Sequence, residues 1–344
     1  MTDDLLAELD DDAPVRERPR RRKRRAGRIW LGVLGGLLAL VLVVLAGIWF
    51  VLQGKLQQIE RIENPFPDEA GRPEQAVVDG EPAINFLLVG TDSRDEAAGD
   101  SLLEALGDRS DTIMVVHIPG DRSGVQVMSI MRDSWVDIPG HGTNKINAAL
   151  SYGGMPLLVQ TVEQLLDTRI DHVGVLGFDG FMGITEALGG VTVHNPTAFS
   201  SGDYDYPVGE IHLQGEEALV YVRSRYPFSD GDYTRVANQQ RFLSAVLGGT
   251  LNRGTLTDPG KLLALTDAVT NHLATDEGVD QGFILGLAPE LAGLRSSDVT
   301  TFTMPTFGTG MEGDQSVVYV DTDRLPALRQ AFDDDTLAEF AAGA

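Results

Sequence analysis

The chain contains no cysteine among its 344 residues. This absence excludes disulfide bonds, a thiol nucleophile and cysteine-ligated zinc. The sequence also lacks the nucleophile elbow G-x-S-x-G and the phosphate loop G-x-x-x-x-G-K-[ST], and its six histidines show no metal-ligand spacing. Serine-esterase, P-loop and histidine-metal chemistries are therefore poor fits.

Basic residues are scarce except at the N-terminus. Nine of the 27 Lys and Arg and seven of the 51 Asp and Glu lie in residues 1–28, so the remainder has 18 basic and 44 acidic residues and a net charge of −26. Such a surface repels nucleic acid and other anionic polymers unless positive charge is concentrated locally. We expect no nucleic-acid partner.

One long apolar run occupies residues 29–52 and has no charged side chain. At about 1.5 Å per residue, a helix of this length crosses the bilayer core of about 30 Å. The preceding basic residues favour a cytoplasmic N-terminus, and no small-residue cleavage site follows. We predict a disordered cytoplasmic tail (1–28), one uncleaved transmembrane helix (29–52), a juxtamembrane linker (53–80) and an extracytoplasmic domain (81–344) in a single-pass protein of the cell membrane.

The domain alternates between strand-like and helix-like segments, which predicts a layered α/β/α fold with a mixed central sheet. The expected strands are 84–89, 112–118, 125–131, 172–178, 191–194, 299–304 and 317–320. The expected helices are 145–151, 156–166, 180–188, 234–251, 261–272, 283–294 and 323–332.

A topological prediction concerns the first three strands. If they form an antiparallel meander, the end of the first, the start of the second and the end of the third share one edge of the sheet. Charged residues occupy all three places: Asp92 and Arg94, Arg109 and Asp111, and Arg132 with Asp133.

Arginines dominate the basic residues of the domain and fall into a few short segments. Seven of the 18 basic residues that follow the apolar run carry the argument: Arg94, Arg109, Arg132, Arg223, Arg225, Arg235 and Arg241. An arginine side chain matches phosphate oxygens bidentately. We interpret these arginines as an anion site, with a structural ion pair at each position as the alternative. Asp92 and Asp111 are candidates to bind a divalent cation or, alternatively, to cap loops.

The sequence resembles the LytR-CpsA-Psr family over roughly residues 81–250. The similar segments are FLLVGTDSR (86–94), DRSDTIMVVHI (108–118), MSIMRDSWVDIPG (128–140), KINAALSYGG (145–154), EALGGVTV (186–193), GEEALVYVRSR (215–225) and DYTRVANQQR (232–241). Seven matches in order are far more specific than any one of them.

The resemblance implies a phosphotransferase of Gram-positive and actinobacterial envelopes. Such an enzyme attaches a teichoic acid, capsule or arabinogalactan polymer from a polyprenyl-pyrophosphate carrier to peptidoglycan, and a pyrophosphatase side activity is possible. It implies that Asp92 and Asp111 bind Mg²⁺ (or Mn²⁺). It also implies a pyrophosphate site of Arg94, Arg109, Arg132, Arg223, Arg225, Arg235 and Gln239, with Arg132, Asp133, Asp232 and Arg235 taking part in catalysis.

Two positions depart from the family pattern. Met131 stands where proline is usual, and Asn238 stands where a further arginine is usual. These departures leave open a second hypothesis, a non-catalytic protein that binds the polyprenyl carrier during wall assembly. A transcriptional regulator is disfavoured, because the predicted topology places an acidic domain outside the cell.

Overall fold

The computed structural model describes Gly54, Leu102 and residues 58–78, 80–91, 112–225, 232–250, 253–256, 258–270 and 272–343. The chain divides into two units, Met1–Val51 and Leu52–Ala344, and all of the described residues belong to the second. The predicted tail and transmembrane segment lie outside them. Among the residues that are described, no helix is both long enough and apolar enough to cross a bilayer.

A seven-stranded mixed sheet forms the centre of the folded unit. Its order is β1 (Glu60–Arg61), β14 (Leu273–Thr275), β9 (His172–Gly177), β4 (Ile84–Thr91), β5 (Thr112–Ile118), β6 (Val125–Ile130) and β15 (Val299–Thr303). Pairing is antiparallel for β14–β9, β4–β5 and β5–β6, and parallel for β1–β14, β9–β4 and β6–β15. All six residues of β6 are buried, as expected for a strand covered on both faces.

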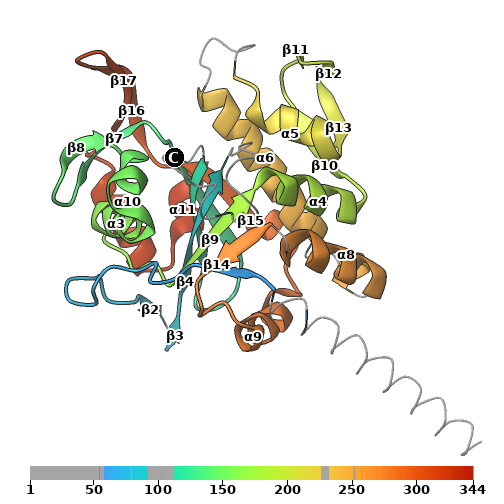
Figure 1. The fold of residues 1–344 in the computed structure, drawn as a ribbon, viewed down its shortest axis with the longest axis horizontal. Helices are drawn as coiled ribbons and strands as arrows, with labels where there is room; N and C mark the ends of the chain where they lie inside the picture. The colour runs from blue at the N-terminus through green and yellow to red at the C-terminus, as the bar shows by residue number, and fades with distance from the viewer. Residues whose placement is uncertain are drawn as a thin grey trace, which may run out of the picture. The chain divides into compact units, whose positions relative to one another are not determined.

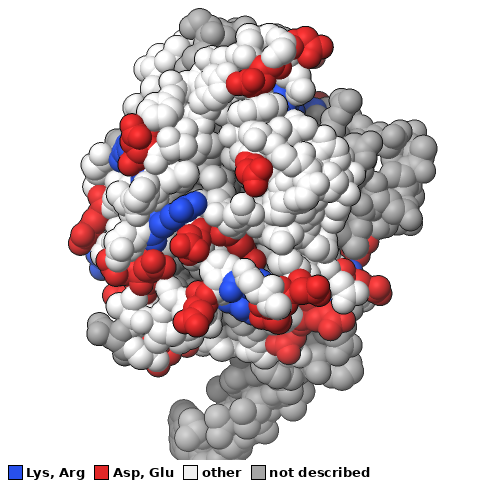
Figure 2. All heavy atoms as spheres, turned by 90° about the vertical axis from the view of Figure 1, so that its left-hand side faces the viewer, with Lys and Arg blue, Asp and Glu red and all other residues white. Residues whose placement is uncertain are grey.

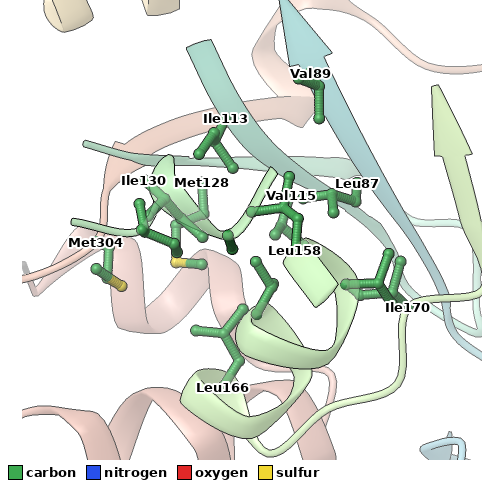
Figure 3. Packing of buried hydrophobic residues seen from close by; sticks show 14 of the residues in the cluster. Leu87, Val89, Ile113, Val115, Met128, Ile130, Leu158, Leu166, Ile170 and Met304 are labelled. Carbon is green, nitrogen blue, oxygen red and sulfur yellow. The ribbon is translucent and has the colours of Figure 1, made fainter. Parts of the chain in front are cut away.

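Helices cover both faces of this sheet (Figure 1). On one face, α3 (Ala148–Leu166), α10 (Leu325–Asp333) and α11 (Leu337–Ala342) contribute to the largest hydrophobic core. In that core Leu158 and Leu166 of α3 lie against the strand residues Val115 and Met128 (Figure 3). On the other face, α6 (Asp232–Thr250) and α9 (Gln281–Leu291) pack over Met114, Val125 and Val127. The predicted α/β fold with a mixed central sheet is confirmed.

Two smaller sheets flank the central one. The first has the order β16 (Thr306–Glu312), β17 (Gln315–Val320), β7 (Ser134–Ile138) and β8 (Gly142–Lys145). The second is the pair β10 (Val191–Asn195) and β13 (Gly209–Leu213), followed by α5 (Gly215–Arg223). A separate core beneath this pair includes Phe199, Tyr206, Tyr221 and Phe242.

The remaining elements are short or peripheral. They are β2 (Val77–Val78), β3 (Glu81–Pro82), α4 (Phe178–Leu188), β11 (Phe199–Ser201), β12 (Tyr204–Tyr206), α7 (Arg253–Leu256), α8 (Pro259–Thr270) and a 3-10 turn at Ser296–Asp298.

The segment predicted as a juxtamembrane linker contributes to the fold. Strand β1 extends the central sheet by pairing with β14, and Ile62 joins the main core. Arg72 donates to the buried Glu163 of α3 through Nη2 at 2.7 Å and to the carbonyl oxygen of Ile170 at 2.6 Å. From residue 58 onward, the described residues of this segment therefore pack against the domain through a strand pairing, a core side chain and the hydrogen bonds of Arg72.

Helix α3 is broken, and two glycines explain the break. Gly154 has φ +65° and ψ −158°, a conformation that is essentially restricted to glycine. A Cβ atom on Gly153 would lie 2.7 Å from the Cβ of Leu157. The sequence predicted two helices here, 145–151 and 156–166. The break was anticipated, but Lys145 belongs to β8 and the first helical turn begins only at Ala148.

Substitution of Gly154 by alanine is expected to destabilise the protein by about 1–3 kcal/mol, because a Cβ atom strains this backbone conformation. The measurement is the unfolding free energy of the full chain in detergent. Gly140→Ala is the matched control, because Gly140 also has positive φ but lies in an exposed turn without nearby atoms. An equal loss in both variants would contradict a special role for the α3 break.

A buried carboxylate gives the fold a predictable acid sensitivity. Burial alone would raise the pKa of Asp276, but hydrogen bonds from His172 and from the backbone amides of Val173 and Gly278 outweigh it, and the pKa is lowered. A carboxylate with a lowered pKa stabilises the fold above its unfolded value of about 3.9, and this stabilisation is lost as pH falls through the folded value.

Asp276→Asn should therefore lower the unfolding temperature at neutral pH and reduce its fall below about pH 4. Thermal unfolding between about pH 3 and pH 7 tests this, with the exposed Asp314→Asn as the control. A variant that retains the full acid dependence of the wild type would refute the assignment.

Candidate functional site

The predicted antiparallel meander of β4, β5 and β6 is present. The strand ends that meet on one side of it form the end of the central sheet that we call its edge. Gly90 near the end of β4 pairs with Thr112 at the start of β5, and Ile113 pairs with Ile130 at the end of β6. The end of β15 joins the same edge, because β15 runs parallel to β6 and Thr303 pairs with Ser129. Of the predicted site residues, Asp92, Arg94, Arg109 and Asp111 lie outside the described residues.

Arg132 and Asp133 form a turn where the chain leaves β6. The amide of Ser134 donates to the carbonyl oxygen of Met131 at 2.9 Å, and the amide of Val318 donates to that of Asp133 at 2.9 Å. The turn is thus fixed to the neighbouring strand β17. The two side chains are 21% and 18% exposed, so both are accessible to a ligand while their backbone is held rigidly.

Asp133 is flanked by two cations. The Lys145 Nζ atom lies 3.0 Å from its Oδ1 atom, and the Arg132 Nε atom lies 3.6 Å from its Oδ2 atom. Because the carboxylate interacts with both, it can fix the position of each cationic side chain. Lys145 was not among the residues predicted for the site. It is one of only three lysines after residue 52, and this scarcity could have marked it as a candidate.

Helix α6 carries the second group of predicted residues to this edge. The Gln240 amide donates to the Ser129 hydroxyl of β6 at 3.1 Å and to the Thr303 hydroxyl of β15 at 3.0 Å. One turn earlier, Val236 packs with Met131 and Val318. Arg132, which follows β6, is therefore next in sequence to Met131, and Arg235 of α6 is next in sequence to Val236. Each arginine adjoins a residue of the same packed cluster.

The predicted residues of α6 have different environments. Arg235 is buried, with 6% exposure. Gln239 donates through Nε2 to the carbonyl oxygen of Val222 at 3.3 Å, which connects α6 to the last turn of α5. For Asp232 only the backbone, as the first residue of α6, is described. Arg235 and Gln239 therefore lie on the same helix, as predicted, but Gln239 uses its amide for a structural bond.

Arg223 and Arg225 lie where α5 ends. Arg223 is the last residue of the helix, and Ser224 is extended with φ −64° and ψ 123°. Arg223 is thus helical, whereas Arg225 follows the extended residue Ser224. Gln239 holds the backbone at Val222 against α6, so the end of α5 is positioned by the helix that carries Arg235.

The two departures from the family pattern have local explanations. Met131 is buried against Val236 and Val318, so its side chain fills the contact between β6 and α6. Asn238 is 1% exposed, and its Oδ1 atom accepts a hydrogen bond from Arg241 Nη1 at 2.9 Å. The neighbouring Arg241 partly offsets the rise that burial imposes on the pKa of Tyr221. An arginine at position 238 would place a second guanidinium beside that of Arg241.

A polar groove of about 440 Å³ opens beside the Arg132–Asp133 turn, and we term it the β8–α3 groove. Its lining residues come from the β6–β7 turn, β8, the start of α3 and the β16–β17 hairpin: Arg132, Asp133, Asn144, Lys145, Asn147, Ala148, Ser151, Tyr152 and Gln315. Most of these residues lie in the segments 128–140 and 145–154 that resemble the family, but the sequence did not indicate that the two segments line one groove.

Within the described part of the chain, no group of three or more His, Asp or Glu side chains lies close enough together to bind a metal ion. The two predicted metal ligands, Asp92 and Asp111, lie outside that part. In the sequence they directly follow Thr91 and directly precede Thr112, the neighbouring ends of β4 and β5.

Comparison with known proteins gives consistent relatives. The LytR_cpsA_psr family model matches residues 56–333. The cell wall biosynthesis protein LcpA of Corynebacterium glutamicum is 31% identical over 89% of this chain and 66% of its own length. The polyisoprenyl-teichoic acid–peptidoglycan teichoic acid transferase TagU of Oceanobacillus iheyensis is 32% identical over 86% of this chain and 91% of its own length. This chain thus spans about two thirds of LcpA and most of TagU.

Solved structures show the same fold. The crystal structure of B. subtilis TagV superposes with a TM-score of 0.61 and 26% identity, covering 74% of this chain and 97% of TagV. A structure of TagT bound to LI-WTA superposes with a TM-score of 0.60 and 24% identity, covering 79% of this chain and 98% of TagT. With the family match across most of its folded unit, this chain belongs to the LytR_cpsA_psr family.

Proposed function

We propose that this protein is a membrane-anchored phosphotransferase. It transfers a glycopolymer from a polyprenyl-pyrophosphate carrier to peptidoglycan outside the cell. The observation that carries the proposal is the pair of cations, Arg132 and Lys145, on Asp133 at the turn after β6 of a unit that is otherwise strongly acidic. The packing of Val236 against Met131 supports a position of the adjacent Arg235 near this turn. The names of two relatives, the teichoic acid transferase TagU and the cell wall biosynthesis protein LcpA, also support the proposal.

The cationic edge suits the leaving group of this reaction. An acceptor hydroxyl oxygen forms a new bond to the phosphorus next to the glycan, and the bond from that phosphorus to the bridging oxygen breaks. Polyprenyl phosphate then leaves with the electron pair. Guanidinium groups that are already in place stabilise this developing negative charge better than mobile water does. Arg132 and Arg235 take this role, with Arg94, Arg109, Arg223 and Arg225 as further candidates.

A divalent cation fits the chain positions next to this edge. Asp92 and Asp111 adjoin the paired ends of β4 and β5, and hard cations such as Mg²⁺ prefer carboxylate oxygens. When bound, the cation supplies positive charge that polarises the pyrophosphate. The aspartates would hold it, while the arginines bind the remaining phosphate oxygens.

The apolar face of the sheet suits the polyprenyl chain. Phe86, Leu88 and Val116 project from central strands and are only partly buried, although α6 and α9 lie over this face. Helix α9 is predominantly apolar in sequence, yet none of its residues is fully buried. Incomplete burial of facing apolar surfaces is typical of a hydrophobic ligand site. The segment 29–52 would anchor the chain to the membrane that contains this lipid.

Replacing Arg132 by alanine should reduce turnover at least about 100-fold, because it removes a charge that binds the leaving phosphate. The assay follows glycan transfer from a polyprenyl-pyrophosphate donor to peptidoglycan by the full chain in vesicles with Mg²⁺. The control is Arg295→Ala, an exposed arginine outside this edge.

Unchanged turnover in Arg132→Ala would refute the assigned site. Donor binding without any transfer in the wild type would instead favour the alternative function, a carrier-binding protein of wall assembly. Activity that persists after chelation would contradict the metal requirement, and phosphate release without an acceptor would reveal a pyrophosphatase side activity.

Two carboxylates are candidates for the proton acceptor, Asp133 and Asp232. The contacts of Asp133 with Lys145 and Arg132 favour a positioning role, since each of its carboxylate oxygens already faces a cation. Asp232 is therefore the preferred base.

Asp232→Asn should remove the acidic limb of the pH–rate profile of the residual activity, because the titrating base is gone. Asp133→Asn should lower kcat while retaining that limb. Profiles of kcat for both variants and the wild type test the assignment, and the opposite pattern would exchange the two roles.

A further inference from the structure

The β8–α3 groove contains an exposed aromatic residue held by its neighbours. Tyr152 is 46% exposed, and its ring stacks on that of His141 with centroids 4.7 Å apart and an interplanar angle of 12°. The Asn144 side-chain amide donates to the Tyr152 hydroxyl oxygen at 2.8 Å. Because that bond uses a lone pair of the oxygen, the phenolic hydrogen is available to an external acceptor.

Two glycines place Tyr152 at the point where α3 is interrupted. It is the last residue before the Gly153–Gly154 break, which follows a single helical turn. Gly154 has φ +65°, a conformation that glycine adopts readily and that residues with a side chain rarely adopt. The exposed ring of Tyr152 therefore lies at a break that the sequence itself encodes.

The groove lining is polar and carries one net positive charge, because Arg132 and Lys145 both lie beside the single carboxylate of Asp133. Asn144, Asn147 and Gln315 contribute amide groups, and the Asp133 carboxylate is compensated by Lys145. Figure 2 views the side of the molecule that faces left in Figure 1 and shows most acidic side chains in its lower half. The upper half, toward β8 and the β16–β17 hairpin, is mainly uncharged. The apolar tail of a lipid would find few suitable partners in such a lining, in which amide groups outnumber apolar side chains.

Saccharides fit these features well. A sugar ring presents a flat face of C–H groups that packs on an aromatic ring, and its hydroxyl and acetamido groups pair with side-chain amides. The groove volume of about 440 Å³ is within the range of small-molecule sites. Its wall also includes Arg132 and Asp133, so a sugar bound there would have a hydroxyl close to the cationic edge.

We propose that the β8–α3 groove binds the acceptor, an amino-sugar strand of peptidoglycan, with the ring of Tyr152 as the stacking surface, His141 supporting that ring by stacking on it, and Asn144 as its positioning residue. This inference rests on the proposed function, since it gives the second substrate a place on the opposite side of Arg132 from the lipid. Donor and acceptor then reach the same edge from different sides and do not compete for one pocket.

The test measures transfer kinetics of the full chain in vesicles with the pyrophosphate-linked donor and a peptidoglycan tetrasaccharide as acceptor. Tyr152→Ala should raise the acceptor KM about tenfold, through loss of stacking and of one hydrogen bond, while kcat and the donor KM stay unchanged. Tyr152→Phe keeps the ring and should show a smaller rise. His141→Ala should also raise the acceptor KM, whereas its matched control His194→Ala, an exposed histidine on β10, should not.

An unchanged acceptor KM in both Tyr152→Ala and His141→Ala, or a raised donor KM, would overturn the proposal. Calorimetric titration of the tetrasaccharide alone into the full chain separates this result from failure of the proposed function. If the wild type transfers nothing but binds the tetrasaccharide, and Tyr152→Ala weakens binding about tenfold, the groove assignment stands without the enzymatic one. Equal binding by wild type and Tyr152→Ala refutes it.

Discussion

The site depends on one buried contact, the amide of Gln240 between the hydroxyls of Ser129 and Thr303. These hydroxyls belong to neighbouring parallel strands, so a single side chain fixes α6 across the ends of both. The contact is largely shielded from water, which makes the loss of either partner costly. Through this contact the helix that carries Arg235 acquires a defined position relative to the turn that carries Arg132.

The two faces of the central sheet differ in how completely their apolar side chains are buried. On the face under α3 the core is fully packed, and Leu87, Val115 and Leu158 are completely buried. On the face under α6 and α9, residues from the same strands remain partly exposed. A protein of this size can bury such residues easily, so a partly open apolar layer beside a cationic edge matches a substrate with an apolar tail and a charged head.

Much of this arrangement was predictable from sequence. The strands β4, β5 and β6 are rich in apolar and β-branched residues, and the short PGDRSG turn between β5 and β6 implies an antiparallel pair. That pairing alone brings distant charged segments to one edge. The sequence could not predict α5, because the GEEALVYVR segment has a mean composition that suits either helix or strand. It also could not predict the complete groove, since Gln315 reaches the segment of Lys145 and Tyr152 only through the pairing of β17 with β7.

The break in α3 has a consequence for how such a protein can change. Ala149 and Leu150 before the glycines and several residues from Met155 to Leu166 after them supply core side chains, while Ser151 and Tyr152 face solvent. The break therefore leaves two adjacent solvent-facing side chains in a helix that is otherwise anchored in the core on both sides of it. If the groove binds the acceptor as proposed, exchange of these two side chains would alter acceptor preference with little change in thermodynamic stability.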